Sequence, residues 1–197
     1  AYRDPNAPYR SWYDFDPKYK GGYRSWWGFE TLPEVNEENP SYVEFITGEG
    51  GVIDTWLRRG AAGFRLDVAD ELPDDFIEKI RAAVKRVSPE KFLLGEVWED
   101  ATTKFGFGQR RTYLLGKGLD SVMNYPFKNA VLDFVKGKPA EQAMGEILSI
   151  CEHYPAPAMD TALNFLSTHD TERALTVIAD EPANGRGREW QSGRCVT

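Results

Sequence analysis

The sequence predicts an α/β fold, in which short buried strands alternate with amphipathic helices. Two observations support this prediction. Apolar residues recur at every second position in short segments, as in strands, and at helical spacing in the longer segments between them. Strands and helices that alternate every few tens of residues form βαβ units, which place the strands in parallel. At 197 residues, of which 41% are hydrophobic, the chain can bury a core as one domain.

The first part of the chain, residues 1–40, has no clear period and is rich in aromatic side chains. It is too long for an ordinary connection, so we interpret it as a functional loop with a short strand end near Leu32–Asn36. Helical spacing starts at Asn39-Pro40, with the proline near the first helical position. It breaks at the glycines between 48 and 51, resumes over 52–57 and ends at Gly60.

The best-defined strand follows directly. Phe64, Leu66 and Val68 alternate with Arg65 and Asp67, which is the period of a strand. A charged pair on a buried strand is costly unless the two groups pair or serve a ligand. A core ion pair is therefore the alternative to a functional role for Arg65 and Asp67.

The βα unit then repeats to the end of the chain, so that residues 41–197 form successive βα units. Further strands are predicted at 92–97, 119–124 and 162–168, with a glycine-rich loop at 106–118. Helices are predicted at 73–87, 127–135, 140–153 and from 171 to about 178.

Acidic residues stand at three of the four strand ends. Asp67 ends the first strand, Glu96 the second and His169-Asp170 the fourth. Parallel strands point the same way, so these groups are expected to share one face with Arg65. Any one acid could instead cap the next helix, and Asp170 before Thr171 could be only that.

Three acids at one face suit glycoside hydrolysis, in which one carboxylate attacks and another donates a proton. Metal binding is the competing chemistry for such a group. The sequence shows no cluster of Cys or His ligands, so a transition-metal site is not expected, whereas a magnesium site stays open.

Composition excludes several partners. The net charge of −7 and the pI near 5.0 argue against a nucleic-acid-binding protein, because no basic patch is available for phosphates. No apolar run reaches the length of a membrane span, so no membrane partner is expected.

At these strand ends the sequence resembles the α-amylase family of glycoside hydrolases (glycoside hydrolase family 13). Gly63–Ala69 resembles the nucleophile strand, Gly95–Trp98 the acid/base strand and Ser167–Asp170 the strand of the third acid. Three further motifs resemble the neopullulanase, cyclomaltodextrinase and maltogenic amylase branch, namely Trp26–Phe29, Leu32–Asn36 and Val122–Phe127. The match covers nearly the whole chain in the family's order.

The resemblance implies a retaining α-glucan hydrolase that acts on α-1,4 or α-1,6 bonds of maltooligosaccharides, cyclodextrins, pullulan or starch. Asp67 would be the nucleophile and Glu96 the general acid/base. The other residues implied in the site are Asp170 as the third catalytic acid and Arg65, His169, Trp98 and Tyr125 in substrate binding. Asp67 is expected to have an arginine partner and Glu96 none. No cofactor is implied for the reaction, although calcium is an option in the full-length enzyme.

The family builds a (β/α)₈ TIM barrel, which needs about 250 residues. This chain resembles only strands 4 to 7 with their helices, so we expect a segment of the catalytic domain that is inactive alone. Its open edges would favour self-association or pairing with the missing part of the barrel. A bacterial cytoplasmic location is expected rather than secretion, although a signal region would not be visible in this segment.

Two alternatives to this function remain. One is a non-catalytic relative that uses the same fold as a binding or interaction module. The complete set of Arg65, Asp67, Glu96 and Asp170 argues against it, because binding alone would not need all four. The other is an unrelated barrel enzyme with a metal or phosphate site, for which no glycine-rich phosphate loop is present.

Overall fold

The computed structural model describes residues 2–179, which form two compact units. Of the described residues, the first unit comprises 2–64 and 72–92, and the second comprises 65–71 and 93–179. The predicted run of βα units at 41–197 is thus divided between them, and its last part, 180–197, lies outside the described residues.

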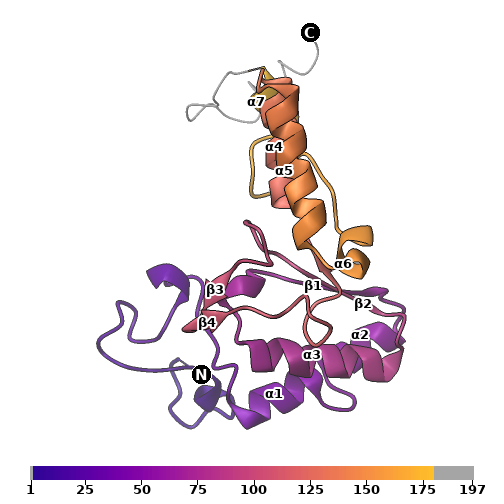
Figure 1. Cartoon of the computed structure of the whole chain (residues 1–197). Helices are drawn as coiled ribbons and strands as arrows, with labels where there is room; N and C mark the ends of the chain where they lie inside the picture. The colour runs from indigo at the N-terminus through magenta and orange to yellow at the C-terminus, as the bar shows by residue number, and fades with distance from the viewer. Residues whose placement is uncertain (1, 180–197) are drawn as a thin grey trace. The chain divides into compact units, whose positions relative to one another are not determined.

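Three helices of the first unit confirm the predicted pattern. They are α1 (Pro40–Thr47), α2 (Val52–Arg58) and α3 (Asp74–Val87). The side chain of Asn39 caps α1 by accepting hydrogen bonds from the backbone N–H groups of Ser41 and Tyr42. Helix α3 packs against both α1 and α2 (Figure 1) and buries its apolar stripe there, Phe76, Ile77, Ile80, Ala83 and Val84.

A buried acid links the helices of this unit. Asp54 of α2 is 1% exposed, and its carboxylate accepts hydrogen bonds from the N–H of Gly50 at 3.1 Å and from Arg86 of α3 at 2.8 Å. Arg58 lies 3.6 Å away. The hydrogen bond from Gly50, that from Arg86 and the charges of both arginines hold the pKa of Asp54 below its ordinary value of 3.8.

The lowered pKa predicts a stability loss in acid. A folded-state pKa below the unfolded value contributes stability that is present above the unfolded value, about 3.9, and is lost as the pH falls through the folded value. We therefore expect the urea midpoint to fall steeply below about pH 4. Asp54→Asn should lower the midpoint at neutral pH and flatten this slope. Glu49→Gln, an exposed acid in the same turn, should leave the slope unchanged. A slope in Asp54→Asn equal to that of the parent would refute the assignment.

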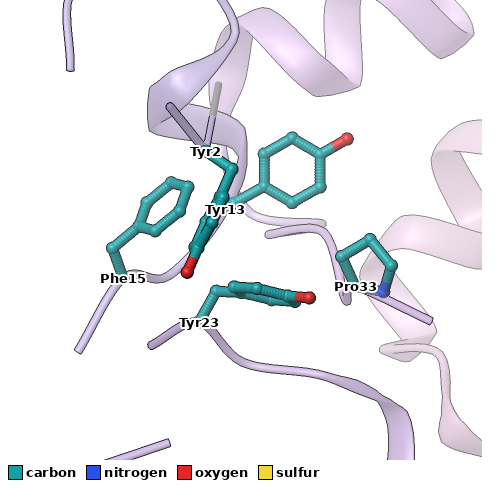
Figure 2. Close-up of a pocket in the computed structure, with 5 residues that line it drawn as sticks. All are labelled: Tyr2, Tyr13, Phe15, Tyr23 and Pro33. Carbon is teal, nitrogen blue, oxygen red and sulfur yellow. The ribbon is translucent and has the colours of Figure 1, made fainter. Parts of the chain in front are cut away.

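The aromatic segment contains little regular secondary structure over residues 2–39, as its lack of period predicts, and ring contacts and hydrogen bonds connect its turns. It contains two short 3₁₀ helices, η1 (Arg10–Trp12) and η2 (Trp26–Gly28), and isolated bridges at Tyr13–Val35 and Ser25–Pro33. A cavity of about 300 Å³ lies in this segment. It is lined by Tyr2, Tyr13, Phe15, Tyr23 and Pro33 (Figure 2). The rings of Tyr2 and Tyr23 meet edge to face at 5.3 Å and 76°.

The strands confirm the predicted parallel sheet. It contains β1 (Gly63–Leu66), β2 (Phe92–Gly95) and β5 (Ser121–Val122), in the order β1-β2-β5. Strands β2 and β5 are parallel, with Leu94 opposite Ser121. A Cβ atom on Gly63 would lie 1.9 Å from the carbonyl oxygen of Phe92, so only glycine allows the two backbones to approach this closely.

The second unit carries the remaining helices. They are η3 (Ala69–Glu71), α4 (Tyr125–Val135), α5 (Ala140–His153), α6 (Ala156–Asp160) and α7 (Ala174–Ile178). Helices α4 and α5 run side by side (Figure 1). The side chain of Asn124 caps α4 by accepting a hydrogen bond from the N–H of Phe127.

Three sequence predictions need correction in this unit. In place of a strand at 162–168, Leu163 alone forms a parallel bridge, to Met123, because the neighbouring segment enters helix α4 at Tyr125, directly after this bridge. The last helix starts at Ala174 rather than 171, because the hydroxyl of Thr171 accepts a hydrogen bond from the N–H of Thr168 and holds a turn there. The loop predicted at 106–118 begins with an antiparallel hairpin of β3 (Phe105–Gly106) and β4 (Gln109–Arg110).

Helix length and hydropathy bear on membrane insertion. Among residues 2–179, no helix combines the length and the apolar character required to cross a membrane.

Candidate active site

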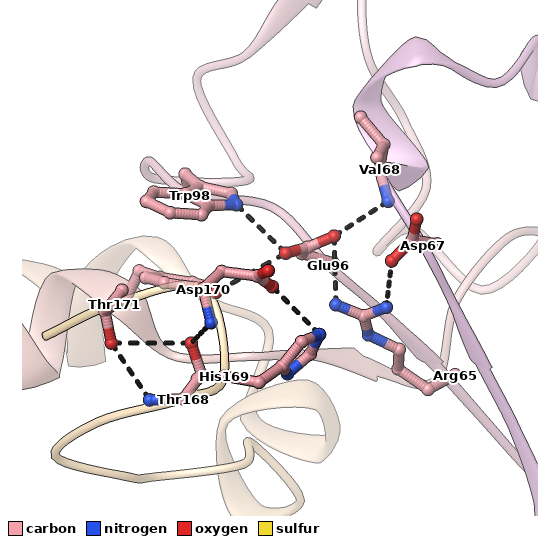
Figure 3. A network of polar contacts seen from close by, with 10 residues as sticks. Arg65, Asp67, Val68, Glu96, Trp98, Thr168, His169, Asp170 and Thr171 are labelled. Atoms are coloured by element: carbon pink, nitrogen blue, oxygen red, sulfur yellow. Dashed lines mark hydrogen bonds and ion pairs between the residues drawn. The ribbon is translucent and has the colours of Figure 1, made fainter. Parts of the chain in front are cut away.

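The second unit brings Arg65, Asp67 and Glu96 together. Arg65 lies on β1, Asp67 follows the end of β1, and Glu96 follows the end of β2. One guanidinium nitrogen of Arg65 pairs with Asp67, and the other lies 3.0 Å from Oε2 of Glu96 (Figure 3). The expectation that Glu96 has no arginine partner is therefore wrong. One cation serves both acids, because β1 and β2 are adjacent and end at the same edge.

The two carboxylates differ in their surroundings. The side chain of Asp67 is 75% exposed, whereas that of Glu96 is 4% exposed. Oε2 of Glu96 accepts a hydrogen bond from the N–H of Val68 at 2.8 Å, and Oε1 accepts one from Nε1 of Trp98 at 3.0 Å and one from the hydroxyl of Tyr125 at 3.4 Å. A buried carboxylate is costly without such partners. Glu96 is thus held in one orientation, while Asp67 faces solvent.

Val68 contributes to this geometry in a way that sequence reasoning missed. Its φ of 45° is in the left-handed region, which a β-branched side chain rarely adopts. Such strain persists only where the surrounding structure imposes it, and it is frequent at active sites. Here the turn after Asp67 directs the N–H of Val68 toward Glu96. No residue type in the sequence indicates this, because the strain arises from the turn itself.

Trp98 and Tyr125 lie beside Glu96, on the loop after β2 and at the start of α4. Their rings stack at 4.5 Å and 14°. Trp98 is 45% exposed and Tyr125 is 1% exposed. Tyr125 is therefore positioned to support Trp98 and to reach Glu96 with its hydroxyl, rather than to offer a ring face to a sugar. Substrate binding by these two residues stays a prediction.

The third acid belongs to a separate turn. Oδ2 of Asp170 lies 3.1 Å from Nε2 of His169 (Figure 3). The backbone N–H of Asp170 donates a hydrogen bond to the hydroxyl of Thr168 at 3.2 Å. The alternative that Asp170 is a helix cap does not hold, because the residue before α7 is Arg173. Burial, with the charges of Glu96 and Asp170, raises the pKa of Tyr125. Glu96 and Asp170 thus both act on the same phenol.

The predicted absence of a metal stays a prediction. Across residues 2–179, no group of three or more His, Cys, Asp or Glu side chains is arranged to hold a metal ion. The carboxylates described above are instead neutralised by Arg65 or held by neutral donors.

This arrangement combines a nucleophile and a proton donor, the two groups that cleave an acetal by double displacement. Asp67 is an exposed carboxylate that can approach an electrophilic carbon. Glu96 is an enclosed carboxyl group that can exchange a proton with the leaving oxygen. Arg65 keeps the two side by side.

Comparison with known proteins gives a consistent result. Residues 10–191 match the family model described as the catalytic domain of α-amylase. The chain is 36% identical over 209 residues to an amylopullulanase of Thermoanaerobacter thermohydrosulfuricus. This match covers 91% of this chain and 13% of that protein. It is 37% identical over 155 residues to a cyclomaltodextrinase of a Bacillus species. This match covers 75% of this chain and 25% of that protein.

Solved structures show the same likeness. The fold matches a cyclic α-maltosyl-(1→6)-maltose hydrolase of Arthrobacter globiformis with a TM-score of 0.79 and 26% identity, over 91% of this chain and 39% of that one. The chain therefore spans less than half the length of these relatives.

Proposed function

The chain belongs to the α-amylase family of glycoside hydrolases, and from this premise we propose that it supplies the catalytic acids of a retaining α-glucan hydrolase. The proposed substrates are maltooligosaccharides, cyclodextrins, pullulan or starch, cleaved at α-1,4 or α-1,6 bonds. The names of the relatives support this choice, since they are an amylopullulanase, a cyclomaltodextrinase and a hydrolase of a cyclic maltose dimer.

In the proposed reaction, Asp67 attacks the anomeric carbon and forms a covalent glycosyl intermediate. Glu96 first protonates the glycosidic oxygen and then removes a proton from the water that releases the sugar. Arg65 pairs with Asp67 and holds it beside Glu96. Asp170, with His169, binds hydroxyl groups of the distorted sugar ring.

A single observation carries the retaining assignment, namely that the guanidinium of Arg65 contacts both acids. A guanidinium is only a few ångströms across, so two carboxylates that contact it must be close together. Retaining glycosidases hold their carboxyl groups about 5–5.5 Å apart, whereas inverting enzymes separate them by roughly 6.5–9.5 Å to admit a water. The shared cation is compatible with the closer pair of a retaining enzyme.

Because the chain spans only part of its relatives, we propose this activity for a full-length enzyme with a complete (β/α)₈ barrel. The isolated segment is expected to be inactive. A bacterial cytoplasmic location and the absence of a required cofactor, with calcium as an option in the full-length enzyme, are part of the same proposal.

The stereochemistry of the product tests the mechanism. We expect the full-length natural protein to release products that are first α-configured at the new reducing end, because two displacements restore the original configuration. ¹H NMR of the anomeric protons during the first turnovers of maltoheptaose measures this before mutarotation. Products that are first β-configured would mean inversion and would disprove the role given to Asp67.

A further inference from the structure

The hairpin of β3 and β4 has an unusual turn. Phe105 pairs with Arg110 and Gly106 with Gln109, which leaves Phe107 and Gly108 at the tip. Both tip residues have positive φ, 51° and 77°. Tight hairpins of this kind strongly prefer Asn-Gly or Asp-Gly, and a phenylalanine in the first position is a conformational outlier. An aromatic ring therefore stands at the tip of the hairpin at a position where its backbone is strained.

The rings of this hairpin face water. Phe105 is 73% exposed and Phe107 is 63% exposed. An asparagine at position 107 would relieve the strain and remove an exposed apolar ring, so the turn itself does not account for the phenylalanine. Strain that folding does not require indicates a functional constraint.

The hairpin is fixed to the turn that follows Asp67. Arg111, directly after β4, is 3% exposed, and its Nη1 donates a 2.6 Å hydrogen bond to the carbonyl oxygen of Asp70. Lys104, directly before β3, lies 2.9 Å from the carboxylate of Asp70. The guanidinium of Arg111 also lies 5.3 Å from the ring centre of Phe107. A buried arginine and a lysine thus join the aromatic tip to η3, three residues beyond Asp67.

We propose that Phe105 and Phe107 form an aromatic platform that binds glucose residues of a long α-glucan beyond those at Asp67 and Glu96. This inference rests on the proposed function. The apolar face of a pyranose ring packs on an aromatic ring held rigidly in water, and rigid rings lose little entropy on binding. A protein partner fits less well, because two phenyl rings offer far less than the roughly 800 Å² per partner of a stable interface.

The test uses the full-length natural protein in the Glu96→Gln background, so that the glucan is bound but not hydrolysed. Calorimetry measures the Kd of maltoheptaose and of maltotriose. Phe107→Asn combined with Phe105→Ala should raise the ratio of the maltoheptaose Kd to the maltotriose Kd by about three- to tenfold, the range expected for aromatic contacts. The asparagine suits the left-handed turn, which offsets the lost contact with Arg111, so the Tm should change little.

Phe134→Asn is the matched control, since Phe134 is 50% exposed on α4, and it should leave the ratio at the parent value. An unchanged ratio in the hairpin variant would overturn the platform. A lower Tm with an unchanged ratio would also overturn it, because the rings would then pack against another part of the protein. The proposed function is tested separately, by measuring hydrolysis of maltoheptaose by the protein that retains Glu96. If that protein does not hydrolyse maltoheptaose, the proposed function fails, whatever the ratio of the two Kd values.

Discussion

Replacing Glu96 by glutamine is expected to lower kcat/KM on maltooligosaccharides by about 10²- to 10⁴-fold, the usual contribution of a general acid or base. The buried side chain is fixed by Val68, Trp98 and Tyr125, so glutamine occupies the same space without a transferable proton. The measurement is steady-state kinetics on the full-length natural protein. Glu152→Gln, an exposed acid on α5, is the control and should remain close to the parent activity.

The role of Glu96 can be separated from a general loss of structure. A maltosyl fluoride needs no protonation of its leaving group, so the first step should proceed in the Glu96→Gln variant and the glycosyl enzyme should accumulate. Azide attacks without losing a proton and should restore turnover. Equal loss on the fluoride and on maltooligosaccharides, with no effect of azide, would show that Glu96 is not the acid/base.

Arg65→Met is expected to have the second largest effect, a lower free energy of unfolding. Removing one partner of a buried ion pair costs about 3–5 kcal/mol, because the other charge is left uncompensated. Glu96 retains three neutral donors, and Arg65 itself is 28% exposed, so a loss of about 3 kcal/mol is expected, at the lower end of that range. Urea unfolding of the described chain measures it.

Two further variants test the shared contact. Arg65→Lys keeps the charge but not the planar fork, so it should recover only part of the loss. In the Glu96→Gln background the cost of Arg65→Met should shrink, because one of the two acids is already neutral. An undiminished cost in that background would mean that Arg65 stabilises the fold through other contacts.

Much of the fold could be predicted from the sequence because its causes are local. The apolar stripe of 73–87 and the break at Gly48–Gly51 depend on neighbours in the chain, and α3, α1 and α2 confirm both. The strand predicted at 162–168 was wrong because a strand needs an extended partner, and the neighbouring segment enters helix α4 at Tyr125, directly after the bridge from Met123 to Leu163. Strand formation is a property of the pair, which a single segment does not reveal.

For the site, the sequence by itself determined the family, because the motifs that contain Asp67, Glu96 and Asp170 stand in the family's order. Only the tertiary structure decided how they are held. In the folded chain Arg65 contacts both Asp67 and Glu96, and the ring of Trp98 stacks on that of Tyr125. The strained backbone of Val68 directs its N–H to Glu96. These contacts cross between strands and loops that are distant in the chain, and their geometry depends on distances that no local pattern encodes.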